Sequence, residues 1–235
     1  MGKNMMGKKI FIHIPKNGGM TIRRNPELSS KVFLAQPKNH INPEYTQGLV
    51  SKMKQTKDHE GYEHARWRDW KVELRNEVPA FAFVRNPWDR VVSRYFFAKK
   101  VIEIEENSDH YGETDYCDCS SFEAFLEERH KWGNEEYMWH RAVRGWYNAF
   151  DYVENGNGKV VCDILRFENY NEDIKLYLGT LTNPPPRNVT AVNKGSYQDI
   201  YTKETIQIIA DWYKKDIDYW GFDFDTGATK NIWNG

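Results

Sequence analysis

Residues 11–22 combine an apolar run with residue types that bind anions. They read Phe-Ile-His-Ile-Pro-Lys-Asn-Gly-Gly-Met-Thr-Ile, so Lys16, Gly18 and Gly19 directly follow the apolar run. Adjacent glycines let the backbone turn so that successive N–H groups point at one spot, and at the start of a helix such a turn binds phosphate- or sulfate-like anions. Lys16 adds a positive charge and Thr21 a hydroxyl donor. The segment therefore predicts an anion-binding loop.

The order of residues separates this loop from the phosphate loop of nucleotide kinases and NTPases. Their signature is Gly-x-x-x-x-Gly-Lys-Ser/Thr, in which the lysine follows the glycines and the Ser/Thr holds magnesium. Here Lys16 precedes Gly18 and Gly19. Taken alone, the segment also fits an ordinary Gly-Gly turn, so its interpretation depends on the rest of the chain.

A second segment, residues 82–95, contains another candidate anion site. It reads Ala-Phe-Val-Arg-Asn-Pro-Trp-Asp-Arg-Val-Val-Ser-Arg-Tyr, so Arg85 ends an apolar run and Ser93 lies in the helical pattern that follows. An arginine at the carboxyl end of a strand faces the crevice in which open α/β sheets bind ligands. Its planar guanidinium suits a phosphate, and Ser93 can donate a further hydrogen bond to the same group.

Residues 59–66 contain the candidates for an acid–base group. They read His-Glu-Gly-Tyr-Glu-His-Ala-Arg, and His and Glu are common general bases. His59 and His64 would be separated by about 500° on a helix, so they would not share a face as the histidines of a His-Glu-x-x-His zinc site do. Gly61 further disfavours a helix here. We predict no metal, and solvated loop histidines remain an alternative to a catalytic base.

Four apolar runs predict the strands that position these segments. They cover residues 8–13, 31–35, 79–84 and 159–165. The second and third runs are apolar on both faces, which is typical of a sheet covered by helices. The two candidate anion segments then follow the first and the third strand. His13, at the end of the first strand, is expected to have a core or supporting role.

Helical patterns lie between and after these strands. Asn86 is predicted to cap a helix that reaches about Ile104. Ser120, in a capping-box signature, is predicted to cap a second helix, and Thr202 precedes a long amphipathic run through Ile217. Strands that alternate with helices predict a three-layer α/β domain with a mainly parallel central sheet flanked by helices.

Length and charge restrict the classes of function. The 235 residues suit a single domain over residues 1–235. With 33 basic and 34 acidic residues the formal net charge is −1, so no global field favours nucleic acid or an anionic membrane as a partner. The apolar run at residues 10–14 is too short for a signal peptide or a membrane span. We therefore expect a cytoplasmic protein, whose oligomeric state stays open.

Together, the two anion segments resemble the donor-binding signatures of sulfotransferases that use 3′-phosphoadenosine-5′-phosphosulfate (PAPS). Residues 15–21 are similar to that family's 5′-phosphosulfate loop, usually Pro-Lys-Thr-Gly-Gly-Thr-Ser, and Arg85 with Ser93 matches its 3′-phosphate pair. The residue pattern of 85–95 is more similar to that of the carbohydrate-type branch (heparan- and chondroitin-like enzymes) than to that of the cytosolic phenol and steroid enzymes. Residues 165–170, 193–196 and 201–224 resemble later family stretches.

The resemblance implies a P-loop-like fold and a set of donor-binding positions. It also implies that PAPS is the donor, that 3′-phosphoadenosine-5′-phosphate (PAP) is the product and that no metal takes part. Asn17, Met20 and Thr21 replace the family's usual Thr, Thr and Ser, which removes one or two hydroxyl contacts. The implied donor-binding residues are Pro15, Lys16, Asn17, Gly18, Gly19, Met20, Thr21, Ile22, Arg85, Ser93, Lys194, Gly195 and Ser196.

The resemblance also implies roles in catalysis. Lys16 stabilises the leaving oxygen during in-line displacement, and His64 best matches the family's acceptor-side base, with Glu63 and His59 in reserve. The acceptor is expected to be a glycan or another small hydroxylated molecule. Two alternatives stay open, namely a P-loop-like kinase and a nucleotide-binding module that has lost turnover.

Overall fold

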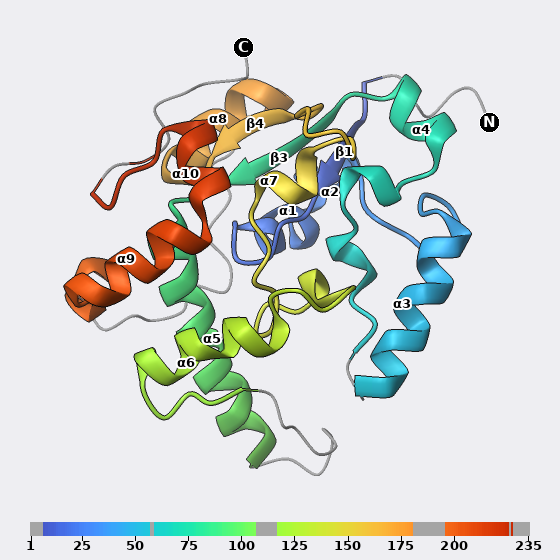
Figure 1. Cartoon of the computed structure of the whole chain (residues 1–235). Helices are drawn as coiled ribbons and strands as arrows, with labels where there is room; N and C mark the ends of the chain where they lie inside the picture. Colours follow the sequence, from blue (N-terminus) through green and yellow to red (C-terminus); the bar gives the residue numbers. More distant parts are fainter. Residues whose placement is uncertain (1–6, 57–58, 107–116, 181–195, 226, 228–235) are drawn as a thin grey trace.

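A parallel sheet forms the centre of the protein. The computed structural model describes residues 7–56, 59–106, 117–180, 196–225 and 227 (Figure 1). Within them, a four-stranded sheet has the order β2-β1-β3-β4, and every neighbouring pair is parallel. The strands are β1 (Lys9–Ile12), β2 (Val32–Phe33), β3 (Ala80–Val84) and β4 (Asp163–Arg166). All four predicted strands are confirmed.

The fourth strand begins later than the apolar pattern predicts. The prediction placed its start at residue 159, whereas β4 starts at Asp163. Val160 instead pairs with Glu154 in an isolated antiparallel bridge. The apolar run therefore serves two purposes, first a return turn and then the edge strand of the sheet.

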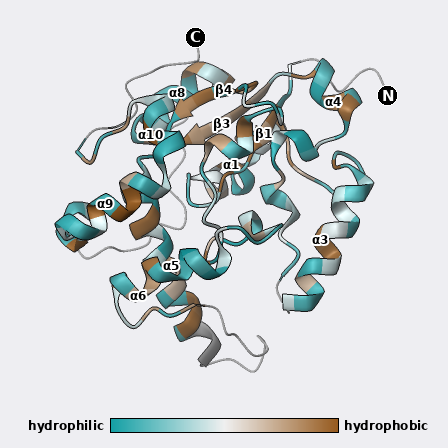
Figure 2. Ribbon diagram, viewed as in Figure 1, coloured by the Kyte–Doolittle hydropathy of each residue, from teal (hydrophilic) through white to brown (hydrophobic). Residues whose placement is uncertain are grey.

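Alternating side chains of the strands support two separate cores, one on each face of the sheet. Phe11, Phe81 and Phe83 lie on one face, while Ile12 and Ala82 lie on the other. This is the period of two that a strand imposes on its side chains. Figure 2 shows the strands in brown between helices that carry much teal. The predicted three-layer α/β architecture is confirmed.

Each face of the sheet is covered by its own helices. The phenylalanine face packs against α1 (Gly19–Arg24), α2 (Pro26–Ser30) and α8 (Tyr170–Leu178). The other face packs against residues of α3 (Pro43–Thr56), α4 (Val72–Glu77), α5 (Pro87–Glu106), α6 (Phe122–Trp132), α7 (Phe150–Val153), α9 (Lys203–Trp212) and α10 (Lys214–Trp220). Short 3-10 turns complete the chain, η1 (Tyr62–His64), η2 (Trp67–Asp69), η3 (Met138–His140), η4 (Phe167–Asn169) and η5 (Tyr197–Ile200).

Helix starts follow the predicted caps with one correction. The Asn86 side chain accepts from the Trp88 amide at 3.0 Å, so α5 begins as predicted. Helix α6 is capped by Ser121, which accepts from the Ala124 amide at 3.0 Å. The prediction of Ser120 was wrong because its hydroxyl is bound to the Asp118 carboxylate at 2.6 Å.

The last amphipathic run forms two helices instead of the predicted one. Thr202 caps α9 by accepting from the Thr205 amide at 3.2 Å, as predicted. Tyr213, with φ −100° and ψ 26°, departs from helical geometry and separates α9 from α10. Its ring is fully buried, so tertiary packing accompanies the break in the helix.

The strand order creates a switch point between β1 and β3. The chain leaves β1 through α1 and α2 on one face, reaches β2, and returns through α3 and α4 on the other face to β3. Ligands of open α/β sheets bind at the carboxyl ends of strands at such a point. The loop that carries Lys16 follows β1 and Arg85 follows β3, so both segments lie at this edge.

Candidate active site

The loop after β1 adopts left-handed backbone geometry at two positions. Lys16 has φ 67° and Gly18 has φ 81°, and α1 begins at Gly19. A Cβ at Gly18 would lie 2.7 Å from Tyr170 Cε2, and one at Gly19 would lie 1.9 Å from His13 Cδ2. Neighbouring rings therefore require both glycines. Gly18 needs its positive φ as well, whereas Gly19 makes room for the buried His13 ring.

Three hydrogen bonds attach this loop to the β3–α5 segment. Asn17 Nδ2 donates to the Phe83 carbonyl at 2.7 Å. Arg85 Nη1 donates to the Lys16 carbonyl at 2.8 Å, and Arg90 Nε donates to the Pro15 carbonyl at 3.3 Å. The structure thus brings the two predicted anion segments into direct contact.

The side chain of Lys16 lies among cations and over an aromatic ring. Its Nζ is 4.3 Å from the centre of the Phe97 ring, and no described carboxylate forms an ion pair with it. Burial lowers the pKa of Lys16 to about 7. The charges of Arg85, Lys100 and Arg94 act in the same direction. An anion bound here would relieve this repulsion.

Arg85 is held in place by its own helix and by an aromatic ring. Its Nε and Nη2 donate to the two carboxylate oxygens of Asp89 at 2.7 and 2.8 Å. Its guanidinium carbon lies 4.2 Å from the centre of the Phe167 ring. A third bond goes to the Lys16 carbonyl, so two of the five guanidinium N–H groups have no acceptor within the described part of the chain.

One face of α5 aligns the predicted donor-binding groups. Asp89, Ser93 and Phe97 are spaced four residues apart, so they lie one above another along the helix. Arg85 binds Asp89 at one end of this row, and the Lys16 ammonium lies over Phe97 at the other end. Ser93 is buried between them. Arg85, Ser93 and the Lys16 ammonium therefore lie along the same face of α5.

His64 lies next to the loop that follows β1, and a hydrogen bond fixes which of its ring nitrogens carries the proton. Its Nδ1 is 2.7 Å from the His13 carbonyl, which can only accept, so Nδ1 carries the proton and Nε2 keeps a lone pair. The His13 and His64 rings are 4.3 Å apart, and His13 packs directly on Gly19. Burial lowers the pKa of His64 to about 4, against the opposing effect of Glu63. The imidazole is therefore neutral near pH 7.

The comparison with protein families agrees with this geometry. Residues 8–223 match the model of a family described as the Sulfotransferase family. The chain belongs to the sulfotransferase family. Sulfuryl transfer is accordingly the general reaction class. No curated protein and no solved structure matches the chain.

The remaining predicted donor-binding positions of this sulfotransferase have different surroundings. Met20 is half-buried and Thr21 is buried, both in the first turn of α1. Ile22 belongs to the core on the phenylalanine face of the sheet, so its side chain is committed to packing. Ser196 is exposed and caps η5. Lys194 and Gly195 lie outside the described residues.

Residues after β4 also support residues 15–21, the predicted donor-binding loop, called the donor loop from here on. Phe167 lies against Arg85, as described above, and Glu168 Oε1 accepts from the Asn86 amide at 2.8 Å. The Tyr170 hydroxyl donates to the Gly18 carbonyl at 3.2 Å. Sequence reasoning noted residues 165–170 without giving them a role. Their place at the carboxyl end of β4, beside β3, is the signal that could have found it.

The two other candidates for the base, Glu63 and His59, already have protein partners. Glu63 forms an ion pair with Arg23 at 3.0 Å. Burial acts to raise the pKa of Glu63, but the charges of His64 and Arg23 are among the effects that lower it. His59 is exposed, and its Nδ1 accepts from the Gly61 amide at 3.1 Å. Of the three candidates, His64 alone combines proximity to the loop with a ring nitrogen that has no described partner.

Across the described ranges, no group of three His, Cys, Asp or Glu side chains is placed to hold a metal ion. In the same ranges, no helix is both long and apolar enough to cross a lipid bilayer.

Proposed function

We propose that this sulfotransferase moves the sulfuryl group of PAPS to a hydroxyl of a carbohydrate or another small hydroxylated acceptor and releases PAP. The observation that carries the proposal is the hydrogen bond from Arg85 to the Lys16 carbonyl, 2.8 Å long, at the switch point of the sheet. It joins two positively charged segments into one surface. A nucleotide with phosphates at both its 3′ and 5′ positions is the ligand that such a pair suits.

The residues at this edge fit the donor's charge. Lys16 has a positive environment and lacks a described carboxylate partner, and two N–H groups of Arg85 have no acceptor among the described residues. Ser93 lies one helical turn beyond Asp89, where its hydroxyl would face the same phosphate as Arg85. In the proposal, Lys16 binds the 5′ end of the donor and Arg85 with Ser93 binds the 3′-phosphate.

The reaction asks the protein for positioning and for charge stabilisation. The acceptor oxygen attacks sulfur in line, a new S–O bond forms, and the bond between sulfur and the phosphate oxygen breaks. Charge then develops on that phosphate oxygen, and the Lys16 ammonium with the loop amides stabilises it. The acceptor proton passes to His64 Nε2, because this atom holds the free lone pair. His64 later returns the proton to water.

The environment of His64 suits a base that is neutral before the reaction. A pKa of about 4 in the ligand-free protein keeps its lone pair available at pH 7. Such a base is weak, but negative charge on a bound donor raises the pKa of a neighbouring imidazole. Proton transfer therefore becomes more favourable once the donor is in place.

The test combines binding with transfer. Calorimetry should detect binding of PAP without added metal, and labelled PAPS should transfer sulfate to at least one member of a panel of glycans, phenols, lipids and tyrosine peptides. Stabilisation against heat by ADP with magnesium, and not by PAP, would point to a kinase instead. Tight PAP binding without transfer to any acceptor would leave a nucleotide-binding module.

A further inference from the structure

The Gly61 carbonyl is shared by the turn that carries His64 and by a second histidine. It accepts from the His64 amide at 3.2 Å, which closes the η1 turn. It also lies 2.5 Å from His140 Nδ1. Because a carbonyl only accepts, His140 carries its proton on Nδ1. One oxygen atom therefore joins the backbone of the candidate base to His140, which lies in η3.

Two buried side chains hold the other nitrogen of His140. Its Nε2, which has the lone pair in this tautomer, faces the Tyr45 hydroxyl, so Tyr45 donates to it. The Tyr45 oxygen in turn accepts from Trp139 Nε1 at 3.1 Å. His140, Tyr45 and Trp139 are at most 7% exposed. The positioning chain, as we name the series Trp139–Tyr45–His140–Gly61, is thus fully paired and shielded from water.

The charge state of the positioning chain is also fixed by burial. Burial lowers the pKa of His140 well below its usual range and raises that of Tyr45 well above it. Both groups are therefore neutral around pH 7. Because every group in the positioning chain is neutral and has a fixed role as donor or acceptor, its hydrogen bonds can run in only one direction. Such a chain is a rigid support.

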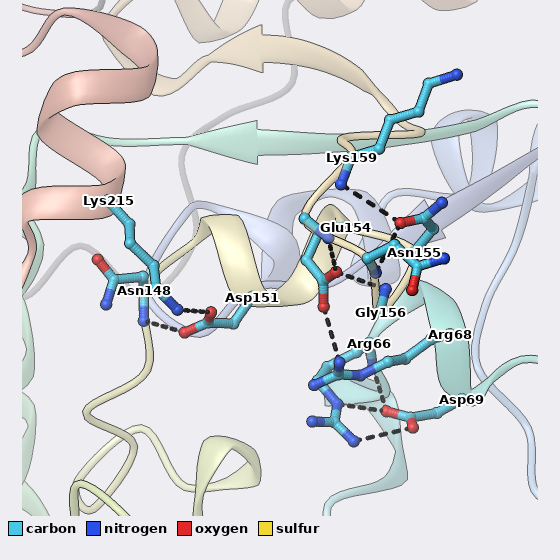
Figure 3. A network of polar contacts seen from close by, with 12 residues as sticks. Arg66, Arg68, Asp69, Asn148, Asp151, Glu154, Asn155, Gly156, Lys159 and Lys215 are labelled. Carbon is cyan, nitrogen blue, oxygen red and sulfur yellow. Dashed lines mark hydrogen bonds and ion pairs between the residues drawn. The ribbon is translucent and has the colours of Figure 1, made fainter.

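A second contact ties the same two segments together. The Arg66 guanidinium lies 3.7 Å from the centre of the Trp139 ring. It also forms a bidentate pair with Asp69, with contacts of 2.8 and 3.1 Å, seen in Figure 3. Arg66 follows His64 by two residues, so η3 contacts the chain on both sides of the candidate base, at Gly61 and at Arg66. The segment between Gly61 and Arg66 has little freedom to move.

We infer that Tyr45 and His140 are positioning residues for His64, through the hydrogen bond that His140 makes to the Gly61 carbonyl. They keep His64 beside the donor loop with Nε2 facing away from the His13 carbonyl. This inference rests on the proposed function in one respect, because it gives His64 the role of base. The positional coupling itself is independent of which reaction follows.

The decisive variant is Tyr45→Phe. It removes one hydroxyl and leaves His140 Nε2 and Trp139 Nε1 without partners in a buried site. A loosened Gly61 turn displaces His64, and misplacement of a catalytic group by about 1 Å lowers rates by up to about 100-fold. We expect kcat to fall about 10-fold or more while PAP affinity stays unchanged. The matched control is Tyr177→Phe, because Tyr177 is also buried and its hydroxyl binds Asp163 on the opposite face of the sheet.

A double-mutant comparison separates positioning from general stability. In a His64→Ala background, Tyr45→Phe should produce no further loss of kcat, because the residue that it positions is absent. A merely structural role would give the same proportional loss in both backgrounds. An equal loss, or a fall in PAP affinity together with kcat, would overturn the inference. If Tyr45→Phe does not fold, Trp139→Phe removes the donor to the Tyr45 hydroxyl and should act in the same direction.

Nitrogen NMR of the imidazole rings tests the coupling without any substrate. Wild-type His64 should show the tautomer with the proton on Nδ1, and its signals or its pKa should change in Tyr45→Phe but not in Tyr177→Phe. Unchanged His64 signals in Tyr45→Phe would refute the coupling whatever the enzyme does. Changed signals in a protein that transfers no sulfate would instead reject the proposed function and leave the coupling standing.

Discussion

The donor loop and the turn that carries His64 are built in different ways. The donor loop is a continuous stretch whose carbonyls are held by Arg85 and Arg90 from the next strand–helix unit. The His64 turn is held by side chains from distant parts of the chain, since Tyr45 and His140 are 95 residues apart. A continuous anion loop can be recognised in the sequence because its residues have a fixed spacing. A support assembled from three separate segments has no such spacing and cannot be recognised in this way.

The two regions also differ in how they handle charge. Lys16 lies in the field of several cations and has no described carboxylate at ion-pair distance, whereas Arg85 is paired with Asp89. The charged form of Lys16 is therefore disfavoured in the ligand-free loop. Around His64 the imidazoles are neutral, and the nearby Arg23 is paired with Glu63. In the proposed reaction, donor binding thus depends on charge, whereas the role of His64 depends on the orientation of a neutral ring. Variants of the two regions should fail in different ways.

The largest effect should come from Lys16→Ala. It removes the charge that stabilises the leaving oxygen, and loss of one such donor costs about 10³-fold in kcat. Transfer from labelled PAPS should become undetectable or nearly so. Lys100→Ala is the control, because Lys100 contributes to the same positive field but is exposed on α5. Comparable rates for the Lys16 variant and wild type would contradict the assignment of the loop.

His64→Ala should lower kcat by about 10²-fold, which is typical for loss of a general base. PAP affinity should stay the same, because the His64 ring packs against His13 and is not one of the groups along α5 that are proposed to bind the nucleotide. Steady-state rates and PAP calorimetry on the same preparation measure both quantities. An unchanged rate would place the base elsewhere, and a weakened PAP affinity would remove the distinction between the two regions.

Arg85→Ala should act mainly on donor binding. Each lost charge-assisted hydrogen bond costs about 1.5–3 kcal/mol, so the Kd for PAP should rise about 10- to 150-fold. Asp89→Asn is the informative partner, since it weakens the grip on Arg85 without removing the guanidinium. If Arg85 binds phosphate, the Asp89 variant keeps its PAP affinity. Equal losses in both variants would show that Arg85 only braces the loop.

Arg85 also illustrates how far the sequence predicts this site. Its place at the end of β3 follows from a local apolar run, and local patterns likewise predicted the strands and the cap at Asn86. Its bond to the Lys16 carbonyl does not follow from any pattern, because it depends on β1 and β3 being neighbours. The same limit explains why no pattern predicted the bond from Asn17, a predicted donor-binding residue, to the Phe83 carbonyl.

The errors in the predicted elements have the same physical origin. Ser120 and Ser121 are equally good helix caps in sequence terms, and only the contact with Asp118 decides between them. The break at Tyr213 falls inside a regular amphipathic pattern and accompanies the burial of its ring. On the acceptor side, no spacing connects Tyr45 with His140. Tertiary packing determines what local propensity leaves open.

The smallest effect, and the one that most sharpens the comparison, is the pH dependence of PAP binding. The protonated form of Lys16 binds the anion, and its pKa in the ligand-free protein is about 7. PAP raises that pKa, so affinity is greatest below pH 7. It should fall by up to about 10-fold per pH unit above pH 7, until the pKa of the complex is reached. Calorimetry at pH 8 in two buffers of different ionisation enthalpy should show uptake of about one proton on binding.

Lys16→Arg provides the control for this prediction. An arginine stays charged across the whole range, so its PAP affinity should not change between pH 6.5 and 8.5, whatever its absolute value. A wild-type protein with pH-independent affinity would show that Lys16 is already charged in the ligand-free loop. In that case groups such as Asp89, which pairs with Arg85, would offset the positive field at Lys16, and the contrast in charge between the donor loop and the His64 turn would not hold.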